Sequence, residues 1–194
     1  MQEHEFLLAP PIFQNYLKTK MTDSTPTEWE AARDDFVAQW GALGSHWGIN
    51  RTMAQIHALL MTAPEPMYTD EIMEKLQISR GNANTNLREL VGWGLIQIIH
   101  RKGERKEFFQ AEKDVWKMVV TIARERKRRE IEPALEVLKS CAERTQSESA
   151  GPGREFYQQM RELQEFVEFG IKVSDTISSM KHASALQWAM KLLG

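Results

Sequence analysis

The stretch SRGNANTNLRELVGWGLI, from Ser79 to Ile96, concentrates hydrogen-bonding side chains in its first half. Four of its first eight residues are Gly or Asn, and each of these costs a helix about 0.5 to 1 kcal/mol relative to Ala. The cost is explained if the segment is a loop, or if these side chains bind something outside the fold. Asn, Arg and Thr are residue types that contact base edges, with Asn suited to adenine, Arg to guanine and the Thr methyl group to thymine.

The apolar spacing predicts that this stretch is a helix, with Ser79 as its N-cap. In a projection at 100° per residue, Ala83, Leu90 and Val91 lie within about 60° of Leu87 and form the expected buried face. The expected exposed half then carries small or hydrogen-bonding residues, with Asn86 and Arg88 on its flanks: Ser79, Arg80, Gly81, Asn82, Thr85 and Asn86. The alternative is that the asparagines only mark a capped, solvent-facing helix start.

A basic turn follows this helix at a short distance. The segment LIQIIHRKGERKEFFQAE has two apolar runs, 95–100 and 107–110, on either side of Gly103, which is typical of a β-hairpin. Its turn carries Arg101, Lys102, Arg105 and Lys106 against a single acid, which leaves a local charge of +3. Cations in such a turn can bind phosphates without regard to sequence. A second basic run, residues 124–129, is interpreted as a solvated helix face.

The remaining elements are expected to be helices. Two helices are predicted over 29–44 and 49–61, the first with an apolar stripe at Trp29, Ala32, Phe36, Trp40 and Leu43. Prolines then interrupt the chain, and Thr69 is expected to cap a short helix, DEIMEKL. A strong helix is predicted over 114–131, restarting at Pro133 and reaching about residue 144, with these positions of the first part inside: Val115, Met118, Val119 and Ile122.

After an expected linker, TQSESAGPG, the last segment has apolar residues at alternating spacings of four and three. Such a narrow seam is typical of helices that pack lengthwise. The seam comprises Phe156, Met160, Leu163, Val167, Gly170, Val173, Ile177 and Met180. A helix break is expected between Gly170 and Ser174, where glycine and small polar residues cluster.

The order of these elements predicts a mainly α fold with a winged helix-turn-helix, because a short helix, a tight turn, a second helix and a basic hairpin follow one another. The expected organisation is an irregular N-terminal arm (1–27), a winged helix-turn-helix lobe with a leading helix (28–112) and a helical dimerisation region (113–194). The stretch from Ser79 to Trp93 is then the recognition helix.

Three segments together resemble the GbsR-type branch of the MarR-like transcriptional regulators: WGINRTMAQIHALL, EIMEKLQISRGNANTNLRELVGWGLI and HRKGERKEFFQAEKDVWKM. The resemblance covers about residues 41–133. It implies a dimeric repressor that binds an inverted repeat, is modulated by a small effector, and dimerises through its terminal helices. Some members of this branch are associated with choline or glycine betaine metabolism.

An effector that carries a quaternary ammonium group would be held by aromatic rings through cation-π attraction. Five aromatic residues are expected in or beside the hinge between the DNA-binding lobe and the dimerisation helices: Phe36, Trp40, Trp47, Trp93 and Trp116. The alternatives are that these rings belong to the core, that the effector is a different small molecule, or that there is none.

Composition excludes several classes of protein. With 194 residues, 42% hydrophobic and 27% charged, the chain has the composition of a globular protein, and no apolar run is long enough to cross a bilayer. The N-terminus has acids where a signal peptide carries bases, so a cytoplasmic location is expected. Cys141 is alone and no His or Cys cluster is evident, so neither metal nor cofactor is expected.

The sequence therefore predicts a homodimeric DNA-binding regulator, expected to be a repressor, that acts on a palindromic operator of double-stranded DNA. No catalytic residues are expected, because the candidate acids have no paired base and the chain has no phosphate-binding glycine loop and no nucleophile elbow. The alternative is a winged-helix module that binds another protein through the same polar helix and basic turn.

Overall fold

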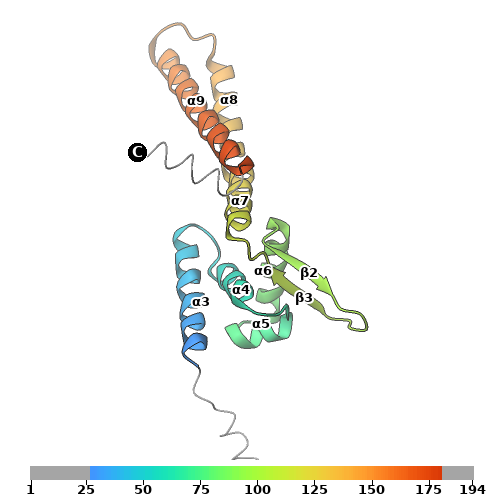
Figure 1. Ribbon diagram of the computed structural model, residues 1–194. Coiled ribbons are helices and arrows are strands. Elements are labelled where there is room, and N and C mark those ends of the chain that lie inside the picture. Colours follow the sequence, from blue (N-terminus) through green and yellow to red (C-terminus); the bar gives the residue numbers. More distant parts are fainter. Residues whose placement is uncertain (1–26, 181–194) are drawn as a thin grey trace, which may run out of the picture.

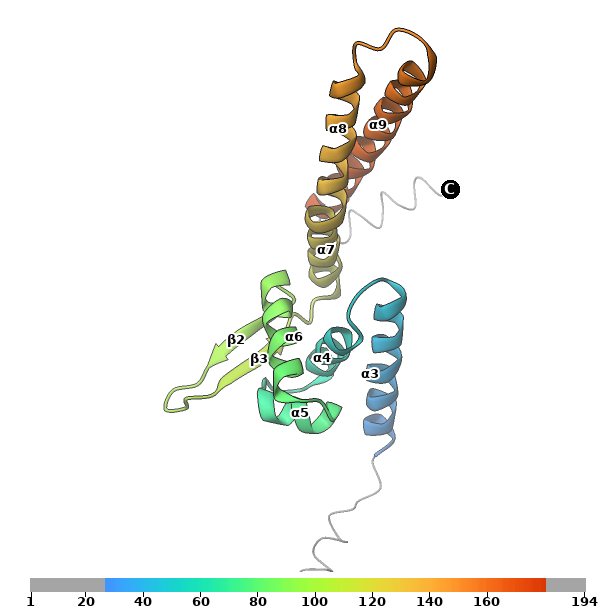
Figure 2. The ribbon, with the colours of Figure 1, turned by 180° about the vertical axis from the view of Figure 1, so that it is seen from behind.

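The computed structural model describes residues 27–180, so residues 1–26 of the expected N-terminal arm lie outside the described residues. Helices α3 to α6 and a small sheet pack into one lobe, and helices α7 to α9 extend away from it (Figures 1 and 2). Within residues 27–180, no helix is long and apolar enough to cross a membrane.

Helix α4 (Arg51–Thr62) lies at the centre of the lobe, and most of its side chains are buried. It packs against α3 (Glu28–His46), α5 (Thr69–Leu76), α6 (Arg80–Trp93) and strand β3 (Glu107–Ala111). The largest fully buried side chains come from three of these helices: Ile56, Leu60, Ile72, Leu87 and Leu90. These residues hold α6 against α4 by burying apolar surface.

Glycine determines how α3 packs on α4. The buried positions of α3 are Val37, Gly41 and Gly44. A Cβ atom at Gly41 would lie 2.4 Å from the Gln55 side chain, and one at Gly44 would lie 2.6 Å from Cβ of Ala54. The two helices therefore approach more closely than larger residues would allow. The expected stripe was partly wrong, because this glycine face turns three of its members outward: Trp29, Ala32 and Leu43.

Helices α5 and α6 each begin at an N-cap residue. Helix α5 begins at Thr69, one residue earlier than expected, and Tyr68 rather than Thr69 is its N-cap. The backbone N–H of Tyr68 donates to the Glu71 carboxylate at 2.9 Å. Helix α6 has the expected cap, since Ser79 Oγ accepts from the backbone N–H of Asn82 at 3.3 Å.

The sheet has three antiparallel strands in the order β1-β3-β2. The predicted hairpin is confirmed as β2 (Ile96–His100) and β3, with Gln97 opposite Gln110. Strand β1 (Met67–Tyr68) pairs with Phe108 and Phe109 and was not predicted. A strand of two residues after a proline has no periodicity that could reveal it.

The helix predicted over 114–131 is divided in two. Helix α7 (Val115–Arg126) passes through a π-helical turn, η1 (Lys127–Ile131), into α8 (Glu132–Thr145), whose first turn contains Pro133. A π-helical turn accommodates one extra residue and widens the helix locally. Two positions expected inside α7 are exposed, Val115 at 63% and Val119 at 48%, because no other element of the described chain covers that side.

Helix α9 (Gly151–Ser179) is continuous, so the expected break between Gly170 and Ser174 was wrong. One glycine costs a helix only about 1 kcal/mol, which the packing of α8 along α9 offsets. The helix also begins inside the expected linker, where Pro152 occupies the first turn. Of the predicted seam, Phe156, Leu163 and Gly170 are exposed and the remaining members are half-buried.

Candidate nucleic-acid interface and the adjoining cavity

The N-terminal half of α6 presents polar side chains on an exposed surface. Ser79, Arg80, Gly81, Asn82 and Thr85 are all exposed, as is Arg88 farther along the helix. Ala83, Leu87 and Leu90 are buried and Val91 is half-buried, as the projection predicted. The apolar face is thus used for packing, and the polar face remains open.

Arg80 forms an ion pair with Asp70 of α5, although its side chain is 61% exposed. The pair joins the start of α6 to the first turn of α5. Because an exposed ion pair contributes only about 0 to 1 kcal/mol, the guanidinium can exchange this partner for another acceptor. Asp70 therefore orients Arg80 without burying it.

Asn86 does not lie on the open surface, which corrects the expectation for this residue. Its side chain is 5% exposed, and its Nδ2 donates to the backbone oxygen of Asn82 at 2.8 Å and to Asn82 Oδ1 at 2.7 Å. Asn82 in turn directs its Nδ2 at Thr52 Oγ1 of α4, 3.4 Å away. The projection placed Asn86 on a flank, and the packing of α6 on α4 covers that flank.

The four cations of the turn between β2 and β3 differ in their surroundings. The Arg101 guanidinium lies 4.1 Å from the centre of the Phe108 ring, and Lys106 Nζ lies 3.9 Å from the centre of the Tyr68 ring. Both rings lie on the sheet, so these two cations also hold the base of the hairpin. Lys102 and Arg105 are exposed and have no hydrogen-bond or ion-pair partner within residues 27–180.

The second basic run, Arg124 to Arg129, is largely committed to internal partners. Arg128 and Arg129 both bind Glu125, and their hydrogen bonds hold the pKa of that carboxyl below its ordinary value. Arg129 also reaches Glu89 of α6 at 3.1 Å and lies 5.0 Å from the centre of the Trp93 ring. Arg129 thus joins this run to α6, which a merely solvated face would not do.

Comparison with known proteins supports the fold that this geometry describes. A solved crystal structure of a transcriptional regulator superposes with a TM-score of 0.60 over 76% of this chain and 95% of that one, at 19% sequence identity. The fold is a winged helix-turn-helix. No protein-family profile matches the chain, and no curated protein matches it.

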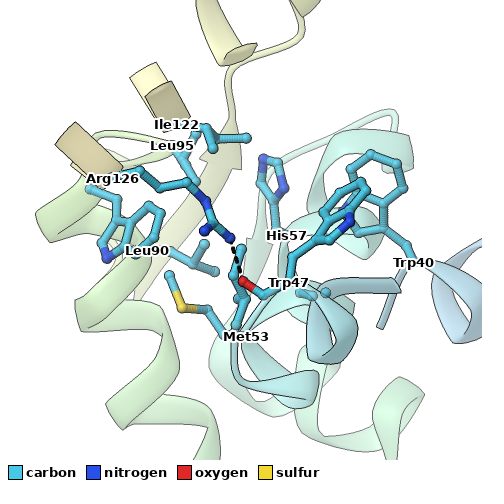
Figure 3. Close-up of a pocket in the computed structure, with 12 residues that line it drawn as sticks. Trp40, Trp47, Met53, His57, Leu90, Leu95, Ile122 and Arg126 are labelled. Carbon is cyan, nitrogen blue, oxygen red and sulfur yellow. Dashed lines mark hydrogen bonds between the residues drawn. The ribbon is translucent and has the colours of Figure 1, made fainter. Parts of the chain in front are cut away.

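A small apolar cavity lies where α7 meets the winged helix-turn-helix, and its volume is about 70 Å³. Trp40 and Trp47 lie on one side of it, with Leu90, Leu95 and Ile122 on the other (Figure 3). Arg126 enters from α7 and donates from Nη2 to the backbone oxygen of Trp47 at 2.6 Å. The structure thus brings three of the five predicted effector residues to this cavity: Trp40, Trp47 and Trp93.

The other two predicted effector residues, Phe36 and Trp116, do not line the cavity. Phe36 packs against Trp40, with ring centres 5.4 Å apart, and so supports a wall of the cavity from behind. The five aromatic residues therefore do not form one cage.

Two residues that line the cavity, His57 of α4 and Trp93 of α6, have buried polar atoms. His57 Nε2 and Trp93 Nε1 are buried and have no hydrogen-bond partner among the described residues. Burial lowers the pKa of His57 to about 4, because the charged imidazolium loses its hydration. The imidazole is therefore neutral at physiological pH.

Sequence reasoning missed four residues that shape these sites: Thr52, His57, Asp70 and Arg126. No role was predicted for His57, and Arg126 belonged to the run interpreted as a solvated helix face. A buried histidine on the Ile56 and Leu60 face of α4 is a detectable signal, since histidine is seldom fully buried. The roles of Thr52 and Asp70 depend on how α4 and α5 pack against α6, which no local pattern reveals.

Proposed function

We propose that this protein is a DNA-binding transcriptional regulator that places α6 in a major groove and the β2–β3 hairpin against the adjoining backbone. The observation that carries the proposal is the combination of an open polar helix start with two unpaired cations, Lys102 and Arg105, on the neighbouring hairpin. The likeness to a transcriptional regulator supports it. In this arrangement, base contacts provide specificity and the hairpin provides affinity.

The protein acts as a homodimer, in this proposal, through helices α7 to α9. Large apolar side chains are exposed along these helices, including Val137 at 62%, Phe166 at 73% and Phe169 at 64%. A folded chain seldom exposes so many together unless they bind a partner. A two-fold dimer would present two copies of α6 to half-sites about 34 Å apart on a palindromic operator. We propose repression, in the manner of the GbsR-type MarR-like regulators that the sequence resembles.

The cavity beside α7 is the proposed effector site. Arg126 places a positive charge at its edge, and its lining contains no carboxylate. A choline-like cation would find no carboxylate in the lining, because Glu130, which pairs with Arg126 at 3.3 Å, lies outside it, so a neutral or acidic ligand fits the cavity better. Such a ligand could accept hydrogen bonds from Trp93 and Arg126. Because Arg126 joins α7 to Trp47, binding there would change how the dimerisation helices hold the DNA-binding lobe.

The protein-binding alternative uses the same polar helix and hairpin, so an experiment on DNA must separate the two. We expect purified protein to bind a fragment from the region upstream of its own gene at least 10³-fold more tightly than a scrambled fragment. The logarithm of affinity should fall linearly with the logarithm of salt concentration. Absence of binding to both fragments at low salt, with the protein folded, would favour the protein-binding module.

A further inference from the structure

Asn82 lies on the exposed face of α6, but its carboxamide is already held from within the fold. Nδ2 of Asn86 donates to the backbone oxygen of Asn82, which can only accept, so this atom of Asn86 is an amino group. The Asn82 atom that lies 2.7 Å from the same Nδ2 must also accept, which makes it the Asn82 oxygen. The two hydrogens of Asn86 Nδ2 thus fix the orientation of the Asn82 amide.

This orientation turns the acceptor of Asn82 toward buried Asn86 and leaves its donor less tightly held. Asn82 Oδ1 is bound by Asn86, whereas Asn82 Nδ2 has only a long contact of 3.4 Å to Thr52 Oγ1. The second hydrogen of Asn82 Nδ2 has no partner among residues 27–180. The usual contact of asparagine with adenine needs the oxygen and the amino group to face the base together. Asn86 opposes that geometry because its hydrogen bond of 2.7 Å directs the oxygen toward a buried side chain and away from the open surface.

We propose that buried Asn86 is a positioning residue which makes Asn82 a donor-only reader of the major groove. The proposal rests on the DNA-binding function proposed above. Guanine, adenine and thymine each present an acceptor in the major groove, whereas cytosine presents only its amino donor. Asn82 therefore excludes cytosine at the position it contacts and accepts the other three bases. This differs from the adenine preference that the sequence suggested for an asparagine.

The burial of Asn86 argues for such a role. Its side chain is 5% exposed on a helix whose other buried positions are apolar. Both of its hydrogen bonds are to Asn82, so it ties together no other elements of the fold. A leucine would bury more apolar surface at the same position. The carboxamide is thus explained by what it does to Asn82.

The test is selection from a pool of DNA fragments randomised over the operator, with binding read by sequencing. The operator position that Asn82 contacts is identified as the one whose base preference is lost in Asn82→Ala. At that position we expect the wild-type protein to disfavour cytosine by about tenfold relative to the other three bases. Asn84→Ala is the matched control, because Asn84 is exposed on the same helix. This variant should leave the base preference at that operator position unchanged.

Asn86→Asp should invert the preference, since a carboxylate of nearly the same shape accepts hydrogen bonds and donates none. Asn82 would then turn its amino group toward the carboxylate and its oxygen toward the groove. Cytosine and adenine, which both offer an amino donor, should gain about tenfold over guanine and thymine at that position. The added negative charge should also lower affinity, but equally for all fragments. A base preference measured within one pool is therefore unaffected by it.

Asn86→Leu provides the same test without a charge, and circular dichroism establishes that each variant is folded. It frees both groups of Asn82, so adenine should become the preferred base at that position. Selection of adenine alone by the wild-type protein would overturn the inference. So would variants of Asn86 that are folded and lose affinity equally for every base. If the wild-type protein selects no sequence at all, the proposed function fails, and this inference fails with it.

Discussion

The two basic runs of this chain, 101–106 and 124–129, have similar compositions and different surroundings. Five of six residues in the second run are cations, one more than in the first. Four of these five are bound to partners inside the protein: Arg126 to Trp47 and Glu130, Lys127 to Asp175, and Arg128 and Arg129 to Glu125. In the first run, Lys102 and Arg105 have no such partner among residues 27–180.

Local geometry explains the difference. In a helix, residues three or four apart are neighbours, so Glu125 and Glu130 lie within reach of the cations between them. The hairpin turn has no such spacing, and Gly103, with φ of +87°, reverses the chain there. A count of charges cannot distinguish the two runs. The positions of the acids can.

Replacing Lys102 and Arg105 together by Ala should have the largest effect. Loss of two phosphate contacts makes the slope of log affinity against log salt concentration less steep by about 1.8 per subunit. It also lowers affinity about 30-fold at 0.15 M salt. Fluorescence anisotropy over a salt series measures both quantities. The matched control is Arg128→Ala with Arg129→Ala, two cations of the second run that are paired with Glu125, which should leave the slope unchanged. Equal losses of slope in the two double variants would show that the runs are equivalent.

Lowering the pH tests the contribution of His57 to stability separately from that of the ion pairs in the second run. Lys and Arg keep their charge between pH 7 and 5, and Glu125, with its lowered pKa, stays ionised. His57 has a pKa of about 4 in the folded protein and about 6.5 when unfolded. The unfolded chain therefore binds more protons as the pH falls below 6.5, and stability decreases.

The expected loss from His57 is about 2 kcal/mol at pH 5 relative to pH 7. Urea denaturation at a series of pH values measures it. His57→Phe should remove most of this pH dependence. An unchanged dependence in that variant would assign the loss to the carboxylates of the ion pairs instead.

Arg129→Ala should have the smallest effect, on stability alone. Arg129 binds Glu89 and Glu125 and packs over Trp93, but its side chain is 37% exposed, which limits the gain from each pair. We expect the free energy of unfolding to fall by about 1 kcal/mol and the salt slope of DNA binding to stay constant. Thermal denaturation and anisotropy on the same sample test this. A reduced slope would mean that Arg129 also contacts DNA.

Much of the fold could be predicted because its signals are local. The Ser79 cap, the apolar face of α6 and the basic hairpin each depend on residues close together in sequence. The faces of α3 and α7 were predicted less well. On α3, two glycines are buried against α4, and three members of the predicted stripe are exposed: Trp29, Ala32 and Leu43. On α7, Val115 and Val119 follow the helical period and are nevertheless exposed.

The sequence predicted which residue types belong to the candidate site, but not the contacts that these residues make. Thr85, Lys102 and Arg105 lie exposed as expected, since turns and helix starts remain at the surface. Asn86 could not be placed correctly, because its burial depends on the angle at which α6 packs on α4. The predicted effector residues were only partly correct for a similar reason. Trp40 and Trp47 line the cavity whereas Phe36 and Trp116 do not, and this depends on the tertiary packing.

The π-helical turn at Lys127–Ile131 has a consequence for how the chain tolerates change in length. Each residue of an α-helix advances the chain by 100° around the axis. Because the π-helical turn already holds one extra residue, deleting one residue within it would restore a regular α-helix and keep α8 and α9 close to their present direction. Deleting one residue from the regular part of α7 would instead turn the α8–α9 hairpin by about 100° relative to the winged helix-turn-helix. The π-helical turn is thus the place along this helix where the chain tolerates a change of one residue in length.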